Sequence, residues 1–281
     1  MLRSRTPEEL RQHYLAEREL AERLRRASRD ERPRLYRDVY DELFRRVPDH
    51  PQLLAARDPR HAEWRQRSVE RELRFLGPYL GAQRVFMEIG AGDCALSLRA
   101  AALARRVYAI DVSEQITGGA EARPSNFELL LTEGTRIPVA DGAVDVAYSN
   151  QLMEHLHPED ALEQVREIYR SLSPGGVYAC ITPNRLHGPR DISAFFDEVA
   201  TGLHLREYTA RELRELMLEA GFSEVRFHAG SRGRFVECPY ASLAALESTL
   251  EALPYRVRKR LADNAPMRAL LGVRITATKP A

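Results

Sequence analysis

A carboxylate and two glycines stand close together where a short apolar run ends. Val85-Phe86-Met87-Glu88-Ile89 has the length of a buried β-strand, and Gly90-Ala91-Gly92 follows it directly. Glycines let the backbone turn sharply and approach a ligand, and the segment from Ala95 onward reads as a helix with free N–H groups at its start. A strand, a glycine turn and a helix in this order predict the ligand-binding opening unit of a doubly wound α/β domain.

Two kinds of cofactor are compatible with this unit. The spacing Gly90-x-Gly92-x-x-Ala95, with Asp111 about twenty residues downstream, fits the fingerprint of dinucleotide-binding folds. Glu88 favours a different ligand, because a carboxylate at the end of the first strand would repel a pyrophosphate and attract a cation. An NAD(P)-dependent oxidoreductase is therefore the more remote alternative.

The pattern Glu88-x-Gly90-x-Gly92 resembles the first motif of class I S-adenosylmethionine-dependent methyltransferases. The resemblance implies that the acid and the turn hold the methionine part of the cofactor. It also implies that Asp111 binds the ribose diol and that Glu133 contacts the adenine amino group. Asp111 has an alternative role as the cap of a helix beginning at Val112-Ser113-Glu114, and Glu133 is otherwise a solvated loop acid. The expected cofactor-binding residues are Glu88, Gly90, Ala91, Gly92, Asp111, Val112, Glu133, Gly134 and Asn150.

The resemblance extends further along the chain. The apolar strand 144–150 is followed by Gln151-Leu152-Met153-Glu154-His155-Leu156, where the family's chain passes under the sulfonium of the cofactor. A helix over about 158–172, the turn Ser173-Pro174-Gly175-Gly176 and an apolar strand over 177–181 come next. A dinucleotide-binding dehydrogenase has no reason to repeat this succession.

Methyl transfer needs little chemical machinery beyond proximity and alignment, because the sulfonium donor carries its own driving force. A phenol or alcohol acceptor needs a base near it, whereas a carboxylate does not. His155 and His187 are the candidate catalytic bases, although His155 equally suits a structural role. The candidate substrate-binding residues are Glu154, Arg185, His204 and Tyr208.

The expected fold is a doubly wound, Rossmann-like α/β domain with a mostly parallel, seven-stranded sheet and an antiparallel last strand at about 272–278. Residues 1–80 show helical periodicity without a strand, which predicts an N-terminal helical cap, either a packed layer or a lid over the substrate pocket. The methyltransferase domain would cover residues 81–281, with a helical insertion at about 232–270. The basic cluster 256–260 in that insertion is compatible with a structural role or with a membrane- or partner-binding surface.

Composition limits the partners. The net charge of +1 and the lack of a basic, aromatic-rich face favour a small-molecule, natural-product-like acceptor over nucleic acid; a peptide or glycan acceptor is the alternative. The three cysteines lack metal-ligand spacing, so we expect no metal and a reducing, cytoplasmic compartment. No apolar run is long enough for a transmembrane segment. A homodimer is compatible with the sequence.

Overall fold

The computed structural model describes residues 5–57, 61–112 and 123–281. Its strands are β1 (Val85–Ile89), β2 (Arg106–Asp111), β3 (Phe127–Leu131), β4 (Val144–Asn150), β5 (Leu172–Thr182), β6 (Glu224–Ser231), β7 (Arg234–Cys238) and β8 (Val273–Thr278). Its α-helices are α1 (Pro7–Arg26), α2 (Arg32–Arg46), α3 (Pro51–Arg57), α4 (Ala62–Leu76), α5 (Ala95–Ala100), α6 (Pro158–Ser171), α7 (Ala210–Glu219), α8 (Tyr240–Glu251), α9 (Tyr255–Ala262) and α10 (Ala265–Leu271). Three 3-10 turns are η2 (Met153–His155), η3 (Arg185–His187) and η4 (Ile192–Phe195). The helix suggested at Ser113 and Glu114 concerns residues outside this description.

The strands form one sheet in the order β3-β2-β1-β4-β5-β8-β6-β7. Strands β1 to β5 pair in parallel, whereas β8 is antiparallel to both β5 and β6. The doubly wound, mostly parallel α/β fold is thus confirmed. The predicted number of strands was one too small, because β7 pairs antiparallel with β6 within the segment assigned to a helical insertion. Positive φ angles at Arg232 and Gly233 make the tight turn of this hairpin.

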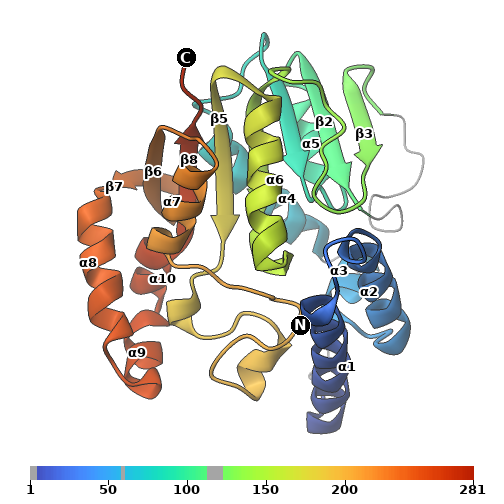
Figure 1. The fold of residues 1–281 in the computed structure, drawn as a ribbon, viewed down its shortest axis with the longest axis vertical. Coiled ribbons are helices and arrows are strands. Elements are labelled where there is room, and N and C mark those ends of the chain that lie inside the picture. The colour runs from blue at the N-terminus through green and yellow to red at the C-terminus, as the bar shows by residue number, and fades with distance from the viewer. Residues whose placement is uncertain (1–4, 58–60, 113–122) are drawn as a thin grey trace.

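Alternate side chains of the central strands pack into two hydrophobic cores on opposite faces of the sheet. Val85, Met87 and Ile89 of β1 pack into a core with α1, α2, α6 and α7. Phe86 points the other way, into a core that α4 and α5 close. Figure 1 shows α6 and α7 in front of the sheet, with the parallel strands running down toward α1 and α2. The period-two alternation therefore sets which face of the sheet each strand residue serves.

The N-terminal helices are fastened beside the carboxyl ends of the parallel strands by one buried ionic network. The guanidinium of Arg32 donates from Nε and Nη2 to the two oxygens of Asp160, at 2.7 and 2.8 Å. Tyr36 donates its hydroxyl hydrogen to the same carboxylate at 2.6 Å. Because Asp160 lies in the first turn of α6, the network ties α2 to a helix of the α/β core.

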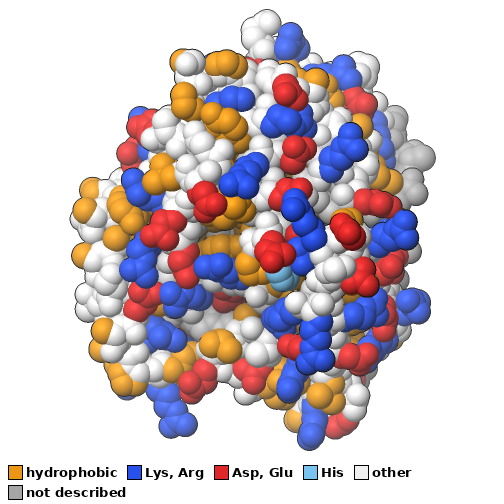
Figure 2. All heavy atoms as spheres, viewed as in Figure 1, with side chains coloured by type: hydrophobic (Ala, Val, Ile, Leu, Met, Phe, Trp, Pro, Cys, Tyr) orange, Lys and Arg blue, Asp and Glu red, His pale blue; other side chains and the backbone are white. Residues whose placement is uncertain are grey.

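The segment between β5 and α7 contains little regular secondary structure. Only η3 and η4 form there, and residues 196–205 continue without regular secondary structure. On the face drawn in Figure 2, basic and acidic side chains alternate without a large patch of one sign. None of the helices that the structure describes is both long and apolar enough to cross a lipid bilayer.

Candidate functional site

A cavity of about 810 Å³ opens where β1 and β4 end. The strand order reverses between these two strands, which is the position where open α/β sheets bind ligands. The glycine turn forms one wall: Gly90 and Gly92 have φ angles of 71° and 53°, which side-chain-bearing residues rarely adopt. The N–H of Gly90 donates to the carbonyl of Ile110 at 2.9 Å, so the turn is held against the end of β2.

Glu88 is a buried acid in the wall of this cavity. Its carboxylate accepts a hydrogen bond from the hydroxyl of Ser97 at 2.5 Å. Burial raises the pKa of Glu88 to about 8, with further contributions from the charges of Glu72 and Asp93, and the bond from Ser97 opposes the rise. A cationic ligand beside Glu88 would remove the cost of ionising it.

Asp111, at the end of β2, also lines the cavity. Its Oδ2 accepts from the N–H of Gly92 and its Oδ1 accepts from the N–H of Val112, both at 2.8 Å. These bonds fix the plane of the carboxylate. The position suits two hydrogen bonds from a ribose diol.

The structure brings together all but one of the residues predicted to hold the cofactor. Those that line the cavity are Glu88, Gly90, Ala91, Gly92, Asp111, Val112, Gly134 and Asn150. Glu133 is exposed and does not line the cavity, whereas the neighbouring Thr132 and Gly134 line it. Gly134 has a φ of 63°, and a Cβ there would lie 3.0 Å from Pro33 of α2. This close approach seats α2 directly on the loop expected near the adenine.

The opposite wall of the cavity comes from the N-terminal helices, which sequence reasoning did not assign to the cofactor. Helix α2 contributes Tyr36, Tyr40 and Phe44, and α4 contributes Trp64, Ser68 and Glu72. Each set is spaced by four residues, so each lies on a single helical face. That spacing is visible in the sequence, but it is equally typical of helix residues that pack into a hydrophobic core.

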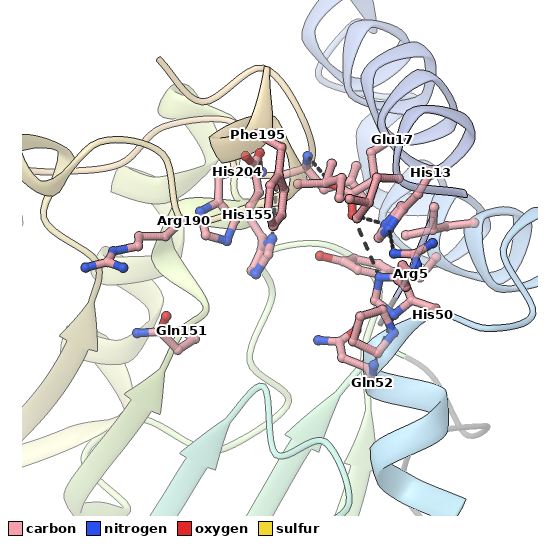
Figure 3. Close-up of a pocket in the computed structure, with 17 residues that line it drawn as sticks. Arg5, His13, Glu17, His50, Gln52, Gln151, His155, Arg190, Phe195 and His204 are labelled. Carbon is pink, nitrogen blue, oxygen red and sulfur yellow. Dashed lines mark hydrogen bonds and ion pairs between the residues drawn. The ribbon is translucent and has the colours of Figure 1, made fainter. Parts of the chain in front are cut away.

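A second cavity, of about 470 Å³, adjoins the first. Tyr40, Gln52, Gln151 and His155 line both cavities, so the two meet at these side chains. Figure 3 shows Arg5, His13, Glu17 and His50 grouped on one side of the second cavity, with His155 and His204 on the other. Apolar side chains complete its lining: Leu10, Leu43, Ile192, Phe195 and Leu203.

His155 is the predicted catalytic residue that lies at the junction. Its Nδ1 lies 3.0 Å from the carbonyl oxygen of Leu203. A carbonyl only accepts, so Nδ1 carries the hydrogen and the neutral ring keeps its lone pair on Nε2. Burial, followed by the neighbouring His204, lowers the pKa of His155 to about 3. The ring is therefore a neutral hydrogen-bond acceptor rather than a strong base.

His204 lines the second cavity and behaves in the opposite way. Burial disfavours its charged form, but the hydrogen bond from Nδ1 to Glu207, at 2.7 Å, and the charges of nearby acids together outweigh burial and raise the pKa of His204. The two rings lie edge to face with centroids 4.8 Å apart. The pKa values of these two adjacent imidazoles are therefore shifted in opposite directions.

The remaining predicted residues lie outside both cavities. Glu154 is buried and accepts from the hydroxyl of Thr182 at 2.9 Å. Arg185 forms ion pairs with Glu212 and Glu251. His187 is buried, with Nε2 lacking a partner, and Tyr208 is buried with a hydroxyl that makes no hydrogen bond.

Glu17, His13 and His50 form a compact buried group that has the composition of a metal site. Its hydrogen bonds indicate another role. Arg5 can only donate, and its Nη1 lies 2.6 Å from Nδ1 of His13, so the hydrogen of that neutral ring is on Nε2, pointing at Glu17. Burial raises the pKa of Glu17, but the hydrogen bonds from His13 and from the N–H of Leu203, together with the nearby His50, outweigh it and lower the value to about 2. Metal-bound histidines instead donate from the second nitrogen.

Residues 87–180 match the model of a family described as a methyltransferase domain. The match covers the glycine turn, Asp111 and the segment through His155 to β5. Residues 87–180 are thus a methyltransferase domain, and the relatives of this part of the chain are S-adenosylmethionine-dependent methyltransferases. The resemblance read from Glu88-x-Gly90-x-Gly92 is confirmed, and S-adenosylmethionine is the cofactor of this domain.

Similar proteins agree with this assignment. A probable S-adenosylmethionine-dependent methyltransferase of Mycolicibacterium smegmatis is 35% identical over 141 residues, which is 50% of this chain and 52% of that protein. One from Mycobacterium tuberculosis is 33% identical over 150 residues, or 53% and 52% of the two chains. The chain thus spans about half the length of the curated relatives it matches.

The methyltransferase fold also recurs among solved structures. A chain in the complex between the Haloferax volcanii Trm112 methyltransferase activator and a methyltransferase gives a TM-score of 0.57 at 17% identity, covering 82% of this chain and 97% of that one. At this identity the likeness concerns the fold alone. The cavity beside β1 fits the cofactor on its own geometry, because Glu88 is a buried acid and Asp111 a fixed one facing the same space.

Proposed function

We propose that this protein transfers a methyl group from S-adenosylmethionine to an oxygen or nitrogen of a small, natural-product-like molecule. The observation that carries the proposal is the junction of the two cavities at Tyr40, Gln52, Gln151 and His155. The larger cavity holds the residues expected for the donor. The smaller one gives an acceptor direct access to the junction, as an in-line displacement requires.

The residues of the larger cavity would hold the cofactor by its separate parts. Glu88 and the glycine turn would take the methionine part, Asp111 the ribose, and the loop at Gly134 the adenine. When bound, the cofactor supplies an electrophilic methyl group whose leaving thioether is neutral. The protein therefore has to position the acceptor and remove water, rather than stabilise a charged leaving group.

His155 is the group best placed to orient the acceptor. Its neutral Nε2 would accept the hydrogen of an attacking O–H or N–H and so point the nucleophile's lone pair away from the ring. Because the pKa of His155 is about 3, the ring would not take the proton of the acceptor before methyl transfer. It would take the proton only after the nucleophile has given electron density to the methyl group.

The proposed acceptor is small because of the size of its cavity. About 470 Å³ lies within the range of small-molecule sites, and helices α1 and α2 with η4 wall it in. A peptide or glycan acceptor is the second candidate, and it would have to enter past the exposed Phe195. We propose that residues 1–80 act as the cap over both cavities, and that the protein is cytoplasmic.

Binding experiments test the proposal directly. We expect S-adenosylhomocysteine to raise the melting temperature of the purified protein, and NAD(H) or NADP(H) to leave it unchanged. Transfer of labelled methyl groups to a panel of phenols, amines and carboxylic acids would then identify the acceptor. Failure of both S-adenosylmethionine and S-adenosylhomocysteine to bind would refute the proposed function.

A further inference from the structure

Glu72 is an acidic residue of α4 that lines the cofactor cavity and belongs to no methyltransferase motif read from the sequence. Two hydroxyl groups fix its carboxylate. Ser68, one turn earlier, donates to Oε1 at 3.1 Å, and Tyr148 of β4 donates to Oε2 at 3.1 Å. Such a fixed carboxylate is pre-organised for a ligand, because little rotamer freedom is left to lose on binding.

Glu72 stands close to Glu88 across the end of the sheet. Tyr148, which holds Glu72, is the cross-strand register partner of Glu88 in the parallel pair β1 and β4. The charge of Glu72 raises the pKa of Glu88, as does that of Asp93. The two carboxylates therefore face the same part of the cavity from α4 and from β1.

Neither carboxylate has a protein cation to balance it. Within the described residues, no lysine, arginine or histidine forms an ion pair with Glu72 or Glu88. Arg71 exerts only a distant attraction on Glu72, and Arg65, which also lines the cavity, lies 3.7 Å from Asp93. Burial raises the pKa of Glu72, with the bonds from Ser68 and Tyr148 opposing the rise. Without a countercharge, the buried carboxylate of Glu88 and the half-buried one of Glu72 are costly to ionise, unless a cationic ligand supplies the positive charge.

We propose that Glu72 is a second cofactor-binding carboxylate, which receives the α-ammonium of the methionine part from the side opposite Glu88. The inference rests on the proposed function. The ammonium has three N–H donors, so it can bond to acceptors on α4 and on β1 together. Helix α4 of the cap thereby takes part in donor binding, and the methionine part is held between the cap and the sheet.

Calorimetric titration of the Glu72→Gln variant tests the proposal. The amide keeps the shape of the side chain and removes the charge. Its NH2 group donates rather than accepts, so the hydroxyl of either Ser68 or Tyr148 has to turn and accept from it. We expect its dissociation constant for S-adenosylhomocysteine to rise about ten-fold or more, as for loss of a hydrogen bond to a charged group. The affinity for 5′-methylthioadenosine, which lacks the amino acid, should not change. Glu70→Gln is the matched control, since Glu70 lies on the same helix outside the cavity.

Each outcome is decisive. Equal loss of affinity for S-adenosylmethionine and S-adenosylhomocysteine, with 5′-methylthioadenosine unaffected, supports the ammonium contact. Loss for S-adenosylmethionine alone would assign Glu72 to the sulfonium and overturn the proposal, and so would unchanged affinity for both. Equal loss for all three ligands would indicate a structural role and also overturn it. If the wild-type protein binds none of them, the proposed function itself fails.

Discussion

The pKa of Glu88 leads to a specific pH dependence of cofactor affinity. Burial raises this pKa to about 8 in the free protein, so at neutral pH most molecules carry a protonated Glu88. A bound ammonium favours the ionised carboxylate and lowers its pKa in the complex. Binding below pH 8 must therefore release a proton, and the affinity must rise as the pH rises toward 8.

The size of the effect follows from the fraction of ionised Glu88. Below the pKa this fraction falls ten-fold per pH unit, so binding of S-adenosylhomocysteine should be about ten-fold weaker at pH 6 than at pH 7. At higher pH the α-amino group of the ligand loses its proton and the affinity should fall again. This group belongs to a free amino acid, whose adjacent carboxylate stabilises the ammonium, so the profile is expected to peak above pH 8.

Titration calorimetry in two buffers of different ionisation enthalpy measures both quantities. At pH 6.5 we expect about one proton released per molecule of S-adenosylhomocysteine bound. Glu88→Gln should bind more weakly near pH 8 and lose the rise of affinity with pH between 6 and 8. An affinity that is flat over that range in the wild-type protein, with no proton released, would refute the placement of Glu88 beside the ammonium.

Three further predictions concern separate parts of the molecule. Asp111→Ala should weaken binding of S-adenosylhomocysteine about ten-fold or more, because two charge-assisted hydrogen bonds to the ribose are lost; unchanged calorimetric affinity would remove the ribose assignment. His155→Ala should lower kcat by about 10²-fold at unchanged cofactor affinity. Because the pKa of His155 is about 3, protonation of this ring should not lower the wild-type kcat above pH 5. Full activity of the variant would exclude His155 as an orienting group. Asp160→Ala should cost about 3 kcal/mol of unfolding free energy in urea titration, because it leaves the buried Arg32 without its main partner; a loss below experimental error would show that the network does not fasten α2.

The lining of the larger cavity was largely predictable because many of its residues follow the strands locally. Glu88, Gly90 and Asp111 each stand at a strand end, and parallel strands that pair bring their carboxyl ends to one edge. Nothing but the period-two pattern and the turn residues is needed to place them. The same logic located Asn150 at the end of β4, next to β1.

The acceptor side was only partly predictable, because long-range contacts decide it. Arg185 follows β5 and was expected to face the substrate, yet its ion-pair partners Glu212 and Glu251 lie 27 and 66 residues later and draw it toward α7 and α8. His187 follows it and is buried away from both cavities. No spacing along the chain contains that information.

For the N-terminal helices, the sequence predicted which residues share a face but not what that face contacts. Tyr36, Tyr40 and Phe44 repeat at a spacing of four, which tells that they share a face but not what the face covers. Gly134 answers the question in the structure, since only a residue without a Cβ lets Pro33 come so near. The sequence predicted Gly134 only as a cofactor-binding residue, because a glycine alone does not tell which element approaches it.

The division of labour between the two parts of the chain follows from which elements line which cavity. The glycine turn and strand ends line only the larger cavity, whereas Tyr40 and Gln52 of the N-terminal helices line both. In the proposed reaction, residues that line both cavities would fix the distance and angle between donor and acceptor, and a small misplacement there would slow the displacement strongly. Substitutions in α1 and η4, which line the smaller cavity alone, can therefore change the acceptor while leaving donor binding intact. Substitutions at Tyr40 cannot, because they alter the wall of the donor cavity and the junction at once.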